Sequence, residues 1–139
     1  MNREFENKHD TLTNETQQKL KQLSQAFLRL HKTLLESAKA DYEAKNGAIT
    51  NSNQYLQLVL DDPYFAWLRK ISAMIALIDE ATSRMRPATE TDAQSLLDEA
   101  KKLLNFEDAD EDFNDKFQAA LQNNSDAVLG HNDALKYLD

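Results

Sequence analysis

The stretch of residues 61–80, DDPYFAWLRKISAMIALIDE, decides the fold of this chain. Asp62 and Pro63 form a helix start, because an aspartate side chain can accept hydrogen bonds from the first free amides and proline suits the first helical position. Beyond them, apolar residues recur every three or four positions around Ile71, which is typical of one buried helix face. They include Tyr64, Trp67, Leu68, Met74, Ile75 and Ile78. We therefore expect a continuous central helix from Pro63 to about Arg84.

Similar spacing predicts helices along most of the chain. The other expected helices cover residues 13–46, 52–60 and 89–104, and a last helix begins near residue 110. Glycine and proline occur only at Gly47, Pro63, Pro87 and Gly130, each of which falls between periodic segments. Strand patterns are absent. The sequence predicts an all-α fold, a helical bundle of four main helices plus one short helix, in a single domain over residues 1–139 with residues 1–12 as a flexible polar N-terminus.

Composition excludes several classes of function. The 139 residues carry a net charge of −8, which argues against binding to nucleic acid or to an anionic membrane. Cysteine is absent, so disulfides, thiolate metal sites and cysteine catalysis are excluded. The first residues, MNREFENKHD, are polar, and no segment approaches the roughly 18 apolar residues of a membrane span. We expect no signal peptide, no membrane contact and a cytoplasmic location.

Acidic side chains gather near the start of the last expected helix. Asp108, Asp110 and Asp112 take positions 1, 3 and 5 of a calcium-binding loop. Position 6 is Phe113 and position 12 is Ala119, where such a loop needs glycine and glutamate. We therefore predict no calcium site, and interpret the segment as solvated acidic charge at a helix N-terminus. A docking surface for a basic partner, or mimicry of nucleic-acid charge, is the alternative.

Helical bundles can hold dinuclear metal sites, which require Glu-x-x-His pairs on two helices. The chain contains one such match, from Glu6 to His9, and it lies in the polar N-terminal segment. Neither His31 nor His131 has a glutamate three residues earlier. We predict no metal and no cofactor.

A polar site in the interior is the sharpest functional candidate. His31 lies within the apolar stripe of the first helix, with Tyr42 on the same side, so it should be at least partly buried and need a hydrogen-bond partner. One interpretation is a structural histidine in the core whose ring nitrogens are hydrogen-bonded. The other pairs His31 with Asp79 across the helix interface as a ligand-binding site, to which Trp67 could belong. No catalytic residue is predicted, because no nucleophile, phosphate or dinucleotide motif is present.

A resemblance covers most of the chain, from about residue 30 to residue 131. The string DPYFAWLRKISAMIALIDE, with LQLVL before it and DFNDKFQAALQNNSDAVLGH near the end, resembles a family of uncharacterised bacterial all-helical proteins. Its most specific part is FAWLR…IDE. The resemblance implies an all-helical bacterial protein and supplies no activity and no catalytic residue.

The sequence favours a non-enzymatic, cytosolic protein–protein interaction module whose partner it does not identify. The alternative is a small-ligand-binding or catalytic bundle using His31 and Asp79. A closed core favours the interaction module, whereas a cavity that reaches His31 favours the ligand-binding bundle.

Helix lengths raise the question of assembly. The first helix, at about 50 Å, is longer than the central helix at about 33 Å. Leu20, Leu23 and Phe27 continue its apolar stripe into the overhang. We expect a homodimer to cover this surface, with the chain's own C-terminal residues around Leu135 and Leu138 as the alternative cover.

Overall fold

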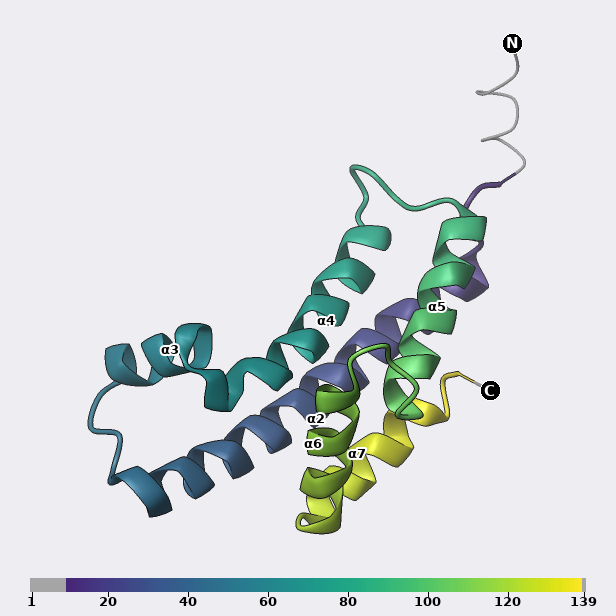
Figure 1. Ribbon diagram of the computed structural model, residues 1–139. Coiled ribbons are helices and arrows are strands. Elements are labelled where there is room, and N and C mark those ends of the chain that lie inside the picture. Colours follow the sequence, from purple (N-terminus) through teal and green to yellow (C-terminus); the bar gives the residue numbers. More distant parts are fainter. Residues whose placement is uncertain (1–9, 139) are drawn as a thin grey trace.

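The computed structural model describes residues 10–138, which fold into helices packed around one long helix at residues 14–46 (Figure 1). The elements are α2 (Asn14–Asn46), α3 (Ser52–Asp61), the 3₁₀ helix η1 (Pro63–Leu68), α4 (Arg69–Ala81), α5 (Glu90–Leu104), α6 (Glu111–Gln122) and α7 (Ser125–Leu135). The all-α prediction is confirmed. Residues 10–138 contain six α-helices, so the expected count of four main helices plus one short helix is not matched.

Helix α2 is the longest helix, and most of the other elements pack against it. The helices α4, α5 and α7 and the segment η1 all pack on it, with α4 along one side and α7 along the other (Figure 1). The Thr13 side chain caps its start by accepting a 3.1 Å hydrogen bond from the Thr16 amide. Gly47 ends it at φ 90°, a backbone conformation that glycine adopts without steric cost. Both ends agree with the sequence prediction.

The apolar stripe at the amino end of α2 is covered within one chain. Leu20, Leu23 and Phe27 are fully buried. Among the residues packed against the same core are Leu135 and Leu138, the C-terminal cover named as the alternative. The apolar overhang on which the expected homodimer rested is therefore covered within one chain, and the homodimer itself stays a prediction.

The expected central helix consists of two elements. Pro63–Leu68 is a 3₁₀ helix and α4 ends at Ala81, so the continuous helix from Pro63 to Arg84 is a wrong prediction. The predicted start is confirmed, because the Asp62 side chain accepts a 2.8 Å hydrogen bond from the Tyr64 amide.

The 3₁₀ geometry changes which aromatic side chains enter the core. With three residues per turn, Phe65 and Leu68 lie on one face, and both are buried. Tyr64 and Trp67 lie together on the neighbouring face and are only half-buried. This rotation leaves two aromatic rings at the surface, beside the site described below.

The last part of the chain forms two helices, α6 and α7, which meet at Asn123 and Asn124. Gly130, expected between periodic segments, is inside α7. A Cβ atom at this position would lie 3.3 Å from Leu30 Cδ1, which is tighter than ordinary van der Waals contact. Gly130 therefore permits the close approach of α7 to α2 and does not break a helix.

The chain just before α2 is joined to the start of α5. The Glu90 amide donates to the Asp10 carbonyl at 3.0 Å, the Thr91 amide donates to Asp10 Oδ1 at 3.0 Å, and Thr11 forms an isolated β-bridge with Thr89. Residues 10 and 11 thus contact the start of α5, and the flexibility expected for residues 1–12 stays a prediction. The part of that segment before residue 10, with the Glu6 and His9 match, lies outside the described residues. Within residues 10–138, no helix combines the length and the apolar character needed to cross a membrane.

Candidate functional site

The structure does not bring His31 and Asp79 together. Asp79 is exposed on α4 and accepts a 2.6 Å hydrogen bond from Ser24 Oγ. Ser24 lies about two helical turns, or about 10 Å, before His31 on α2. Asp79 is therefore bound at a different level of α2 from His31. His31 is half-buried, burial lowers the pKa of its imidazole, and its ring makes no hydrogen bond with the described part of the chain. The predicted polar site is therefore not assembled, and the hydrogen-bond partner expected for His31 is not seen.

The other two candidates, Tyr42 and Trp67, belong to neighbouring aromatic groups. The Tyr42 ring centroid lies 5.6 Å from the centroids of both Tyr64 and Phe65. The Trp67 ring lies 6.1 Å from Phe113 on α6. Tyr42 contributes to packing between α2 and η1, whereas Trp67 has one side open to a cleft.

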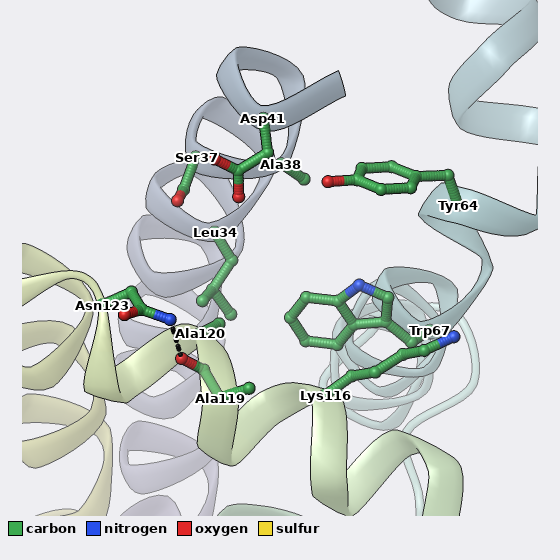
Figure 2. Close-up of a pocket in the computed structure, with 10 residues that line it drawn as sticks. All are labelled: Leu34, Ser37, Ala38, Asp41, Tyr64, Trp67, Lys116, Ala119, Ala120 and Asn123. Carbon is green, nitrogen blue, oxygen red and sulfur yellow. Dashed lines mark hydrogen bonds between the residues drawn. The ribbon is translucent and has the colours of Figure 1, made fainter. Parts of the chain in front are cut away.

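This cleft, which we call the Trp67 cleft, lies between α2, η1 and α6 (Figure 2). Its volume is about 240 Å³. The lining residues are Leu34, Ser37, Ala38, Asp41, Tyr64, Trp67, Lys116, Ala119, Ala120 and Asn123. Aliphatic side chains and the indole of Trp67 provide apolar walls, and polar groups from α2 and η1 stand above them.

Two of the polar side chains that line the Trp67 cleft, those of Asp41 and Tyr64, make no hydrogen bond or ion pair within residues 10–138. The Asp41 carboxylate comes from α2 and the Tyr64 hydroxyl from η1. In Figure 2 the carboxylate is turned towards Ser37, and the hydroxyl is directed towards Ala38 on α2. Burial, and secondarily the negative charge of Asp41, raise the pKa of the Tyr64 hydroxyl. The cleft therefore presents a carboxyl group and a phenol hydroxyl side by side.

Of the other polar residues that line the Trp67 cleft, Lys116 and Asn123 are already engaged, whereas Ser37 makes no side-chain hydrogen bond within residues 10–138. Lys116 forms a 3.1 Å ion pair with Asp112, one turn earlier on α6. Figure 2 shows its side chain running along the Trp67 ring, with the ammonium group directed away from Asp41. The Asn123 amide donates a 2.9 Å hydrogen bond to the Ala119 carbonyl. Asp41 therefore carries the one unpaired charge among the residues that line this cleft.

A second exposed feature is the outer face of α3. This helix has no fully buried residue and contacts η1. Leu56 and Leu60, one turn apart, are 54% and 55% exposed. Exposed apolar side chains grouped on one helix are typical of protein contact surfaces.

The acidic segment before α6 is engaged in local structure. Asp108 Oδ2 accepts 2.9 Å hydrogen bonds from Lys70 Nζ and from the Asp110 amide, and Asp110 Oδ1 caps α6 by accepting from the Phe113 amide at 3.2 Å. Burial works against the ionised form of Asp108, but these bonds outweigh it and hold the pKa of that carboxyl below its usual value. Residues 10–138 contain no group of three or more acidic or histidine side chains that could hold a metal ion.

Sequence reasoning named Trp67 as a ligand-binding candidate but missed Asp41 and Lys116. These residues are far apart in the chain and share a site because α2, η1 and α6 meet there. The one available signal for this site was Asp62-Pro63 before an aromatic-rich segment. That signal marks a helix start, but it does not distinguish a 3₁₀ helix from an α-helix.

Comparisons with protein-family models, with curated proteins and with solved structures find no match to this chain. The resemblance to bacterial helical proteins therefore stands on the quoted residues alone, and no function is supplied by a relative.

Proposed function

We propose that this protein is a non-enzymatic protein–protein interaction module and that the Trp67 cleft receives an anchoring side chain of its partner. The observation that carries this proposal is the size of the cleft. Its volume of about 240 Å³ is below the roughly 300–1,000 Å³ of sites that enclose small-molecule ligands. A single anchor residue entering a well-packed pocket is the feature on which protein interfaces concentrate their binding energy.

The surface around the fold also supports a protein partner. Leu56 and Leu60 on α3 expose apolar area that a folded partner could cover. The net charge of −8 favours a partner with a basic surface, because complementary charge speeds association and disfavours wrong partners.

The alternative, a ligand-binding or catalytic bundle built on His31 and Asp79, has less support. Neither residue lines the Trp67 cleft. Asp79 is exposed and hydrogen-bonded to Ser24, so it is not poised against the His31 ring.

The test is to fill the Trp67 cleft and measure partner capture. Ala119→Phe places a large side chain at the cleft from an exposed position on α6. Ala76→Phe is the matched control, because Ala76 is an exposed alanine within α4 that does not line the cleft. Both variants should keep wild-type helicity and melting temperature. We expect the wild type and Ala76→Phe to recover the same protein from host cells by affinity capture, and Ala119→Phe to lose it. Equal recovery by all three proteins would show that the partner binds elsewhere.

A further inference from the structure

The charges around the Trp67 cleft indicate which anchor it takes. We propose that the occupant is an arginine side chain of the partner protein, with its guanidinium group stacked on Trp67 and paired with Asp41. This inference rests on the proposed function, because it names the chemistry of the anchor that the interaction module receives.

The charges at the Trp67 cleft favour a cationic anchor. Asp41 has no ion pair among residues 10–138, whereas Lys116 is neutralised by Asp112 and points away from Asp41. An acidic anchor would be repelled by Asp41. An apolar anchor would offer no hydrogen bond to the half-buried Tyr64 hydroxyl or to the exposed Asp41 carboxylate, so it would use neither polar group. A cation avoids both drawbacks.

The shape of the Trp67 cleft favours a planar cation. A guanidinium group is planar, stacks on aromatic faces and carries five N–H donors in a fixed fork. The Trp67 cleft offers an indole wall beside acceptor oxygens on Asp41, Tyr64 and Ser37. An ammonium group is a compact, strongly hydrated charge that cannot stack in this way. The cleft therefore fits arginine better than lysine.

Two lysine side chains near the Trp67 cleft already lie over aromatic rings. Lys45 Nζ lies 5.7 Å from the centroid of the Tyr64 ring, and Lys39 Nζ lies 5.0 Å from the centroid of the Tyr55 ring. Both distances are within the range of cation–π attraction. Trp67 borders the same region, and no lysine or arginine among residues 10–138 makes such a contact with its ring. Tryptophan has the best ring for the interaction.

Intrinsic fluorescence gives a direct readout, because Trp67 is the only tryptophan in the chain. The probes are blocked tripeptides with arginine, lysine, leucine or citrulline at the centre, where citrulline is the uncharged isostere of arginine. We expect the arginine peptide to produce a saturable change with a Kd of about 1 mM. Asp41→Asn should weaken it about tenfold, as expected for loss of a hydrogen bond to a charged group. The matched control Asp98→Asn removes an exposed carboxylate on α5 that does not line the cleft, and should leave the Kd unchanged.

Several results would overturn the inference. They are equal binding of the arginine and citrulline peptides, an arginine Kd that Asp41→Asn leaves unchanged, tighter binding of the lysine or leucine peptide, or no saturable change with any peptide. Tighter binding of free arginine than of the blocked peptide would also overturn it, since the cleft would then be a small-molecule site. Partner capture by the Ala119→Phe and Ala76→Phe pair judges the proposed function separately, so the anchor chemistry can fail while the interaction module stands.

Discussion

The Thr16 hydroxyl on α2 donates a 2.6 Å hydrogen bond to the Glu90 carboxylate at the start of α5. The same carboxylate accepts 2.9 Å hydrogen bonds from the Thr13 amide and from the Gln94 side chain. These bonds, that from the Thr13 amide first, lower the pKa of Glu90 to about 2, against a smaller opposing effect of burial. Glu90 thus ties the amino ends of two helices together.

The lowered pKa of Glu90 makes this junction pH-dependent. Because the folded-state pKa lies below the unfolded value of 4.5, the stabilisation is fully present above pH 4.5 and is lost as the pH falls towards 2. We expect Glu90→Gln to lower the free energy of unfolding at pH 7 by about 1 kcal/mol, a modest figure because the partly exposed group is screened by solvent. Urea titrations at pH 7 and pH 3 check this, and the difference between wild type and variant should shrink at pH 3. A difference that stays constant with pH would contradict it.

The cap at the start of η1 gives a second prediction. Asp62→Ala removes the side chain that accepts from the Tyr64 amide, and should cost about 1 kcal/mol of stability. Asp61→Ala is the control, because Asp61 is exposed and its side chain makes no hydrogen bond within the described residues. Denaturant midpoints of the two variants measure the difference. If both shift equally, the cap contributes nothing of its own.

Calcium should leave the protein unchanged. Asp108 and Asp110 already accept hydrogen bonds from Lys70 and from backbone amides, and the segment lacks the glycine and glutamate of a calcium loop. Millimolar calcium should therefore not raise the melting temperature at matched ionic strength, as a scanning calorimetry experiment can show. Magnesium at the same concentration is the control. A rise of several degrees with calcium alone would reveal a site.

The carboxyl end of α5 is held by a histidine from α7. His131 Nε2 lies 2.7 Å from the Leu104 carbonyl, so the ring can donate to an otherwise free helix-end oxygen. The His131 ring centroid also lies 5.4 Å from those of Phe106 and Phe117. Phe106 has φ 61°, which is uncommon for a residue other than glycine, and this packing holds it there.

His131→Phe tests this arrangement. The substitution keeps an aromatic ring beside Phe106 but leaves the Leu104 carbonyl without its donor, so it should cost about 1–3 kcal/mol of stability. His31→Phe is the control, since the half-buried His31 ring makes no hydrogen bond within residues 10–138, and it should change stability less. Thermal melts of both variants give the comparison. A larger loss for His31→Phe would mean that the hydrogen bond of His131 matters less than ring packing.

Local chemistry let the sequence place most helix ends. Gly47 ends α2 and Thr89 caps α5 as expected, because caps and stops act over a single turn. The α2 stripe of Leu20, Leu23 and Phe27 was likewise readable, since its spacing repeats with the helix.

Packing between distant segments decided the rest. The sequence did not reveal that Pro63–Leu68 would wind as a 3₁₀ helix, because the proline start suits either helix and burial of Phe65 selects between them. The sequence also did not reveal that Gly130 lies inside α7, where the missing side chain leaves room for Leu30 of α2. Ser24 and Asp79 meet, and His31 and Asp79 do not, because the register of α4 on α2 is set by the whole interface. The Trp67 cleft exists only where three elements cross, so its residues share no spacing that a sequence pattern could carry.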